Sequence, residues 1–399
     1  MKTRKRFQIN FAPYFRNVKR PTARTVLCLT VCILGLGISA TAQWPKIITF
    51  DDPHAGTAPG QGTFGIGIIP DGTIVGAYID AGNAYHGLLR APNGTITRFD
   101  PPGAGTGSGQ GTQPWLGMNP AGEITGGYVD SGNVLHGYLR TPEGMYTIFN
   151  APWAGTTAGL GSGGCSINAA GLILGGDLYA SDVEHAFLRT PNGKFITFHA
   201  SGAGTDAGQG TWPDTFSGLN DAGAVVGFFL DSSFGVHGFV RSQEGVISTI
   251  DAPGVTTGVW LGTYASSINS EGTTTGYYSD ASAMFHGFVR TADGTFTTFD
   301  APGVGTGAWQ GTFPSNINPA GAITGNTVDA GGVAHGFLRA PDGQFTMFDA
   351  PGAGNESGQG TFPYSNNPAG AITGNYIDWK SVSHGFLLPA MPWGIFAVE

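Results

Sequence analysis

Short apolar stretches separated by turn residues recur along the chain at a nearly fixed period. Their clearest marker is a His followed by a small residue, two apolar residues and, in six of seven copies, Arg. The copies are His86 to Arg90, His136 to Arg140, His185 to Arg189, His237 to Arg241, His286 to Arg290, His335 to Arg339 and His384 to Leu388. Successive His residues lie 50, 49, 52, 49, 49 and 49 positions apart. This period is typical of propeller blades and too long for a parallel β-helix.

The sixth copy shows the pattern within one repeat. Apolar and β-branched residues predict strands over 313–318, 322–329, 334–339 and 344–349, with Pro- and Gly-containing turns between them. Four strands joined by short turns form an antiparallel meander. A Gly-rich loop of 11 residues, 351–361 at the corresponding place one repeat on, leads to the next copy. We therefore predict an all-β protein, a seven-bladed β-propeller of four-stranded antiparallel blades.

The start of the chain predicts how the ring closes. Residues 47–51 (IITFD) resemble only the fourth strand of a repeat, as in FTTFD at 296–300. In a ring this strand completes the last blade and removes two exposed sheet edges. The C-terminal segment 394–398 competes for the same place, and the following loop (PHAGT) favours the N-terminal strand.

An Asp precedes the His of most repeats by six residues. Folding the second strand onto the third places Asp329 opposite His335 and predicts a cross-strand hydrogen bond. The predicted structural pairs are Asp80/His86, Asp130/His136, Asp231/His237, Asp280/His286, Asp329/His335 and Asp378/His384. The third repeat departs from this pattern, with Asp182 three residues before His185.

Asp beside His also occurs in catalytic triads and metal sites. A catalytic group is singular, however, so a pair copied into nearly every repeat favours a structural role. The chain has no GxSxG, HExxH or EF-hand spacing. We therefore assign no catalytic residue, no metal site and no cofactor. The recurrent Arg is expected to pack its stem beside Gly, with a solvated guanidinium.

Tryptophans in the Gly-rich loops are the candidates for ligand binding. Indole rings on one face stack on sugar rings or contact a peptide. The candidates are Trp115, Trp153, Trp260 and Trp309, of which the last two occupy equivalent positions. Asp52, Asp206, Asp214 and Glu356 are the repeat-specific acids that an enzyme could use, and nothing in the sequence groups them together.

The N-terminus predicts export. Eight basic residues and no acid occur in residues 1–25, an apolar stretch follows over 26–39, and Ala40-Thr41-Ala42 is typical of a signal peptidase site. About 14 apolar residues are too few for a membrane-spanning helix. We expect residues 1–42 to be a signal peptide cleaved near Ala42 and 43–399 to be the propeller, with a secreted, extracellular or periplasmic location.

Removal of the signal changes the charge and the cysteine count. The mature part keeps 10 basic and 27 acidic residues, a net charge of −17, and only Cys165 among the cysteines. This charge argues against nucleic acid and against attraction to anionic lipid, and one Cys forms no internal disulfide. We expect a monomer without stable membrane insertion.

The repeated HGFLR or HAFLR, PDG and FTxFD segments over 46–388 resemble the bacterial extracellular HAF-repeat family. The resemblance implies export and a repeated β architecture, with no activity to assign to residues. We expect a non-enzymatic binding module whose ligand, a polysaccharide or an extracellular protein, meets the face with the long loops. The alternatives are an extracellular polysaccharide lyase or glycosidase and a purely architectural surface or matrix protein.

Overall fold

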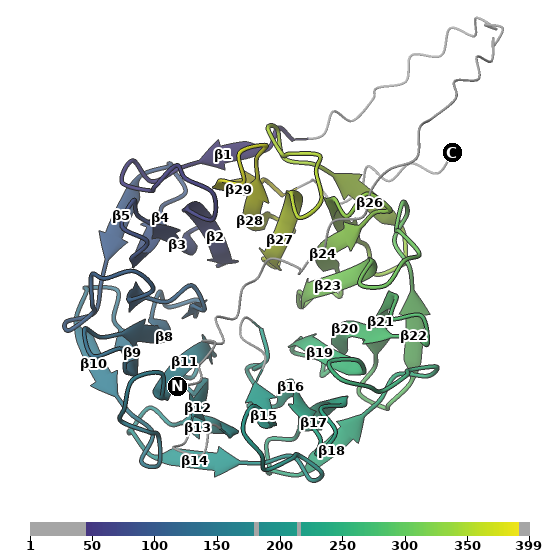
Figure 1. Cartoon of the computed structure of the whole chain (residues 1–399), viewed down its shortest axis with the longest axis horizontal. Coiled ribbons are helices and arrows are strands. Elements are labelled where there is room, and N and C mark those ends of the chain that lie inside the picture. Colours follow the sequence, from purple (N-terminus) through teal and green to yellow (C-terminus); the bar gives the residue numbers. More distant parts are fainter. Residues whose placement is uncertain (1–44, 179–182, 214–216, 391–399) are drawn as a thin grey trace, which may run out of the picture.

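The structure is a ring of β-strands around a central axis (Figure 1). The computed structural model describes residues 45–178, 183–213 and 217–390, which contain 29 strands and no α-helix. Nowhere in this described part is there a helix with the length and apolar character needed to cross a bilayer. The all-β prediction is confirmed.

All strands belong to one continuous sheet made of antiparallel meanders. The first three meanders are β2 (Gly62–Ile68), β3 (Ile74–Ile79), β4 (Tyr85–Arg90) and β5 (Ile96–Phe99); β6 (Gly111–Thr112), β7 (Gly117–Met118), β8 (Ile124–Val129), β9 (Leu135–Arg140) and β10 (Tyr146–Phe149); and β11 (Gly161–Ile167), β12 (Ile173–Leu178), β13 (Glu184–Arg189) and β14 (Phe195–Phe198).

The next three meanders repeat the order. They are β15 (Gly210–Pro213), β16 (Val225–Leu230), β17 (Val236–Arg241) and β18 (Ile247–Ile250); β19 (Thr263–Ile268), β20 (Thr274–Ser279), β21 (Phe285–Arg290) and β22 (Phe296–Phe299); and β23 (Gly311–Ile317), β24 (Ile323–Val328), β25 (Ala334–Arg339) and β26 (Phe345–Phe348). This arrangement of radial meanders is a β-propeller.

The two ends of the described chain meet in the last meander. It contains β27 (Gly360–Asn366), β28 (Ile372–Ile377) and β29 (Ser383–Leu388), and its outer strand is β1 (Ile48–Phe50). β1 pairs antiparallel with β29, with Thr49 opposite Phe386, as the sequence predicted. The competing segment 394–398 lies outside the described residues.

The strand register differs by two residues from the predicted one. Thr327 rather than Asp329 lies opposite His335, and Gly325 lies opposite Phe337. Asp329 instead opens a five-residue turn that ends with a bond from its backbone N–H to the Val333 carbonyl, 3.0 Å. The predicted pairing centres the turn on Gly332, whereas the observed pairing centres it on Gly331, because the capping role of the Asp side chain was not considered.

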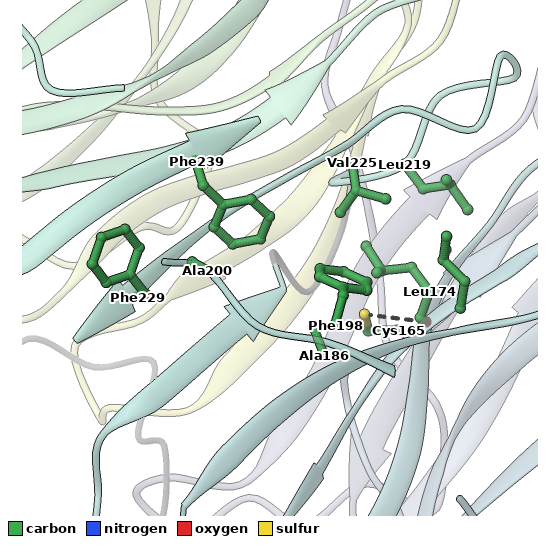
Figure 2. Packing of buried hydrophobic residues seen from close by; sticks show 10 residues of the cluster. Cys165, Leu174, Ala186, Phe198, Ala200, Leu219, Val225, Phe229 and Phe239 are labelled. Carbon is green, nitrogen blue, oxygen red and sulfur yellow. Dashed lines mark hydrogen bonds between the residues drawn. The ribbon is translucent and has the colours of Figure 1, made fainter. Parts of the chain in front are cut away.

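The core lies within the meanders and between neighbours. The third strands contribute fully buried aromatic side chains, among them Phe187, Phe239, Phe288, Phe337 and Phe386. Gly87 follows the His because a Cβ there would lie 2.4 Å from the Phe99 ring. Figure 2 shows one cluster in which Cys165 and Leu174 of the third repeat pack near Val225 and Phe239 of the fourth.

Four of the six recurrent Arg residues are buried by the neighbouring meander, which corrects the predicted solvated head, and Arg290 and Arg339 are half-buried. Arg90 and Arg241 are 5% and 7% exposed. Their guanidinium carbons lie 5.2 Å and 5.0 Å from the ring centres of Phe50 and Phe198, in the outer strands of the preceding meanders. Equivalent cation–π contacts join Arg140, Arg189 and Arg339 to the preceding repeat, whereas Arg290 lies over Phe296 of its own repeat.

A belt of asparagine side chains joins the meanders near the axis. Each Asn opens the turn between the first and second strands and donates its amide to the backbone carbonyl of the next Asn. The distances are 3.2, 3.1, 3.0, 3.5, 3.0 and 3.2 Å for Asn119 to Asn168, Asn168 to Asn220, Asn220 to Asn269, Asn269 to Asn318, Asn318 to Asn367 and Asn367 to Ile69. Ile69 holds the seventh position. Its side chain carries no amide, so no side-chain bond of the belt reaches Asn119.

Candidate functional site

One face of the ring gathers the long Gly-rich loops and the turns between the second and third strands, and we call it the loop face. The loops are 51–61, 100–110, 150–160, 199–209, 251–261, 300–310 and 349–359. The described turns are 80–84, 130–134, 231–235, 280–284, 329–333 and 378–382. Gln61 ties both together, because its Nε2 donates to Asn83 Oδ1 at 2.9 Å while the Gly60 N–H reaches the Ser381 carbonyl of the previous meander at 2.8 Å.

An Asp stabilises each described turn of this face. The Oδ1 atom of Asp80 accepts the backbone N–H groups of Gly82 and Ala84, both at 2.8 Å. Asp231 and Asp280 accept equivalent bonds in their turns. The second oxygen, Oδ2, is left to face the His of the same repeat.

Five of the six paired His residues lie between two carboxylates rather than beside one, and His136 has the amide of Asn150 in place of the second. His86 Nδ1 is 2.8 Å from Asp100 Oδ2, in the following loop, and Nε2 is 3.5 Å from Asp80 Oδ2. The five other predicted pairs have Nε2–Oδ2 distances of 3.2 to 3.6 Å, and only His136 to Asp130 forms a hydrogen bond, at 3.2 Å. The predicted Asp residues are therefore adjacent to the His, but the stronger partner comes 14 residues later.

At His86 and His335 the two carboxylates favour the imidazolium form. The hydrogen bond with Asp100 raises the pKa of His86 against the opposing effect of burial. At His335 burial acts to lower the pKa, but Asp349 and Asp329 outweigh it and the pKa is raised. Each His also stacks on the aromatic residue opposite it where one is present, as Tyr78 does on His86 at 4.7 Å. These features fit a structural role for the repeated pairs.

The third repeat replaces this arrangement with different chemistry. Asp177 takes the aromatic position opposite His185, and His199 takes the position of Asp100, with the two imidazole rings 4.4 Å apart. Asp177 is 1% exposed, and neither of its oxygens has a hydrogen-bond partner among the described residues. Burial raises the pKa of Asp177 to about 7, and burial together with His199 lowers that of His185 to about 4. Asp182 lies outside the described residues.

The third repeat also differs in the loop that precedes it, at Trp153. Trp153 takes the loop position of Gly103 and Gly352, where a Cβ would contact Tyr128 and Tyr376. In the third repeat Asp177 thus replaces an aromatic strand residue. Trp153, which is 56% exposed, replaces a loop glycine. Sequence comparison of the seven copies position by position would reveal this exchange, but only the strand register shows that the two sites are neighbours.

The predicted ligand-binding tryptophans differ in their surroundings. Trp153 and Trp309 are 56% and 46% exposed on the loop face, and Trp260 is partly buried there. Trp115 instead packs against the apolar cluster of Cys165 and fills the space left by Gly127 and Gly163. Its surroundings are those of a packing residue, so we omit it from the site. Trp379, in the turn 378–382, is 72% exposed and was not predicted.

Trp260 and Trp309 both have a left-handed backbone conformation. Their φ values are 60° and 65°, and the equivalent residue of the other five loops is Gly, with φ between 77° and 89° at Gly60, Gly109, Gly159, Gly208 and Gly358. A side chain costs about 1 to 2 kcal/mol in this region of φ and ψ. Two loops thus carry a bulky ring where glycine is the unstrained choice.

Trp309 rests on a continuous aromatic ladder. Its ring centre is 5.6 Å from that of Phe285, which contacts Tyr277 at 5.6 Å and Phe313 at 5.2 Å. Tyr264 extends the ladder by stacking on Tyr277 at 4.8 Å and lies 5.0 Å from Phe228. The ladder supports the exposed ring on rigid strands rather than on the loop alone.

The repeat-specific acids do not come together. Asp52 is buried and paired with Arg98 Nε at 2.7 Å. The backbone N–H groups of Asp206 and Glu356 donate to Gln209 and Gln359 in two different loops, and Asp214 lies outside the described residues. Within the described ranges no group of three or more His, Cys, Asp and Glu residues is arranged to hold a metal ion.

Comparisons with known proteins give likeness of fold. No protein-family model and no curated protein matches the chain. Puromycin hydrolase is similar with a TM-score of 0.51 and 13% identity over 85% of this chain, which spans about half (53%) of that structure. The BP39L lectin from Burkholderia pseudomallei (TM-score 0.47, 11% identity, 88% of this chain and 99% of that one) and the Aleuria aurantia lectin, a six-bladed β-propeller (0.39, 11%, 72% and 95%), are also similar. No functional residue is carried over from these structures.

Proposed function

We propose that the protein is an exported, non-catalytic β-propeller that binds a polysaccharide through the loop face. The observation that carries the proposal is the pair of strained tryptophans, Trp260 and Trp309, in adjacent loops. Strain that recurs at exposed positions is retained where it has a function, because glycine removes it at no steric cost. Indole rings provide the flat apolar surface on which sugar rings stack.

We infer further that each meander is one four-stranded blade and that the ring has seven. One meander accompanies each copy of the His motif. The 29th strand arises because the first strand of the second repeat is divided into β6 and β7, both of which pair with β8. The proposed domain is 43–399, after a signal peptide cleaved near Ala42, in a monomeric member of the HAF-repeat family. N-terminal sequencing of the protein from culture medium and periplasm tests the cleavage site and the location.

We propose that the protein is not an enzyme because its repeat-specific acids lie far apart in the sequence and in different loops. Asp52, Asp206 and Glu356 belong to three separate loops, whereas a glycosidase needs two carboxyl groups about 5 to 10 Å apart across one bond. Polysaccharides incubated with residues 43–399 are expected to release no new reducing or unsaturated ends. Release of such ends, abolished by one Asp or Glu substitution, would establish an enzyme instead.

Glycine substitutions at the strained positions test the binding role. We expect Trp260→Gly with Trp309→Gly to reduce polysaccharide affinity about tenfold or more, while the free energy of unfolding changes by no more than ~1 to 2 kcal/mol because relieved strain offsets lost packing. Calorimetric titration and urea unfolding measure the two quantities. Gly358→Trp, in an equivalent loop, is the control for an added ring. Unchanged affinity in the double variant for every polysaccharide that binds the parent protein would refute the proposed site.

A further inference from the structure

Carboxylates surround the exposed tryptophans on the loop face. An Asp opens each described turn of that face, at Asp80, Asp130, Asp231, Asp280, Asp329 and Asp378, and another opens most of the long loops, at Asp51, Asp100, Asp251, Asp300 and Asp349. Several side chains remain open to solvent, with Asp300 42% and Asp349 52% exposed. In the described turns and loops of this face the single Lys or Arg is Lys380.

Positive charge lies toward the opposite face. The recurrent Arg residues reach the turns between the third and fourth strands, where Arg140 Nη2 approaches Gly144 and Arg241 Nη2 approaches Gly245. The opposite face also carries acids, such as Asp71, Glu143 and Asp293, but there the recurrent Arg residues offset them. The loop face therefore presents a negative potential to an approaching ligand.

Tryptophans and carboxylates of the loop face belong to the same turns. The backbone N–H of Trp309 donates to the carbonyl of Ala283 at 2.7 Å, in the turn that Asp280 stabilises. The backbone N–H of Trp260 donates to the carbonyl of Phe234 at 3.0 Å, in the turn that Asp231 stabilises. The loop residue that carries each indole is thereby bonded to a turn that contains a carboxylate.

Lys380 shows that this combination accommodates a cation. Its ammonium nitrogen lies 4.9 Å from the centre of the exposed Trp379 ring, and its backbone N–H bonds to Asp378 Oδ1 at 2.8 Å. An ammonium over an indole is attracted by the ring quadrupole, and a nearby carboxylate adds Coulomb attraction. The turn 378–382 thus contains the cation–π contact that an external amine would make at Trp309.

Two hollows of about 240 and 220 Å³ are formed by described residues, and both are lined by the turns between first and second strands, including Asp221 and Asn220, away from the loop face. A ligand without a deep pocket gains affinity from several shallow contacts. Stacked sugar rings supply such contacts.

We propose that the ligand of the loop face is a cationic polysaccharide, a glycan with free amino groups on rings that stack on Trp260 and Trp309. The inference rests on the proposed function and narrows its ligand class. The sugar C–H face contacts the indole, and the ammonium groups face Asp280, Asp300 and their equivalents. Neutral glycans lose the charge contacts, and polyuronates are repelled.

Matched oligosaccharides test this inference on residues 43–399. Fully deacetylated chitohexaose and its N-acetylated form differ in charge at the same linkage, and calorimetry at pH 6 measures both. We expect the amine form to bind at least about tenfold more tightly, corresponding to ~1.4 kcal/mol. Raising the ionic strength from about 20 to 150 mM should weaken its binding, because salt screens exposed charges.

Variants locate the charge effect. Asp300→Asn is expected to reduce affinity for the amine form, while Asp71→Asn, on the opposite face, leaves it unchanged. Circular dichroism verifies that both variants fold.

Each other outcome overturns a defined part of the proposal. Equal affinity for both oligosaccharides, with loss in the tryptophan variant, would refute the cationic class and leave the proposed function intact. Tighter binding of poly-lysine than of the amine oligosaccharide would assign the face to a basic polypeptide. Failure of every glycan to bind would overturn both proposals.

Discussion

Asp177 shows how one residue changes the chemistry of a repeated position. The other repeats place Tyr78, Tyr128, Phe229, Tyr278 and Tyr376 against the His ring, and Thr327 in the sixth. A carboxyl at this buried place finds no hydrogen-bond partner among the described residues, so burial favours its protonated form. Ionisation of Asp177 therefore costs more free energy in the folded state than in the unfolded state.

Replacement of Asp177 should therefore stabilise the protein above neutral pH. The folded pKa of about 7 exceeds the ordinary value of 3.8, so the folded state binds more protons and stability falls as pH rises from about 4 to 7. Asp177→Asn removes this dependence and is expected to raise the free energy of unfolding at pH 8 by a few kcal/mol. Urea unfolding of both proteins at pH 5 and pH 8 measures it. An equal difference at the two pH values would contradict the assignment.

Replacement of His86, unlike that of Asp177, should destabilise the protein. The pKa of His86 is raised in the fold by Asp100 and Asp80, so its contribution is fully present below pH 6.5 and disappears as pH rises through the folded value. His86→Gln is expected to destabilise the protein by up to about 1 kcal/mol at pH 5 and by less at pH 8. Thermal unfolding at both values checks this. In an Asp100→Asn background the pH dependence of the His86 effect should shrink.

At the scale of elements, the sequence predicted the strands and their order but not how the turns set their register. The third strand of the sixth repeat, Ala334–Arg339, has its predicted bounds. Capping by Asp329 moves the centre of the turn by one residue and thereby shifts the pairing by two, because side-chain capping of backbone N–H groups is not visible in an apolar pattern. The second partner of the His residues lies beyond the paired third and fourth strands, and the Arg heads are buried by a neighbouring meander. Both were missed because neither contact is visible in the apolar pattern of a single strand.

The hydrogen bonds of the asparagine belt join neighbouring meanders and should contribute measurably to the free energy of unfolding. Asn168 is buried, accepts the N–H groups of Ala170 and Leu172, and donates to Asn220. Asn168→Ala removes three hydrogen bonds and should reduce the free energy of unfolding by ~2 to 4 kcal/mol. Asn93→Ala, which removes a single exposed bond to Thr95, is the control and should cost less than ~1 kcal/mol. Equal effects in urea unfolding would show that the belt adds no stability.

For the whole molecule, ring closure depends on three residues of β1. Without Ile48–Phe50, β29 becomes an exposed edge and Arg90 loses the Phe50 ring. A protein that begins at residue 52 is expected to unfold at a lower temperature than residues 43–399 and to associate through the free edge. Differential scanning calorimetry and size-exclusion chromatography test both effects. A control that begins at residue 46 retains β1 and should behave as the longer chain does.

The same closing strand affects the order in which the chain can fold. His384 and Asp51, joined by side chains at 3.0 Å, are separated by 333 positions. Loop-closure entropy rises only with the logarithm of that separation, but contacts so distant in sequence form late and slow the search for the native state. The adjacent repeats can pair as they are synthesised, whereas the last meander must wait for the chain's final strands. A ribosome that stalls before residue 383 therefore leaves an open arc with two unsatisfied edges.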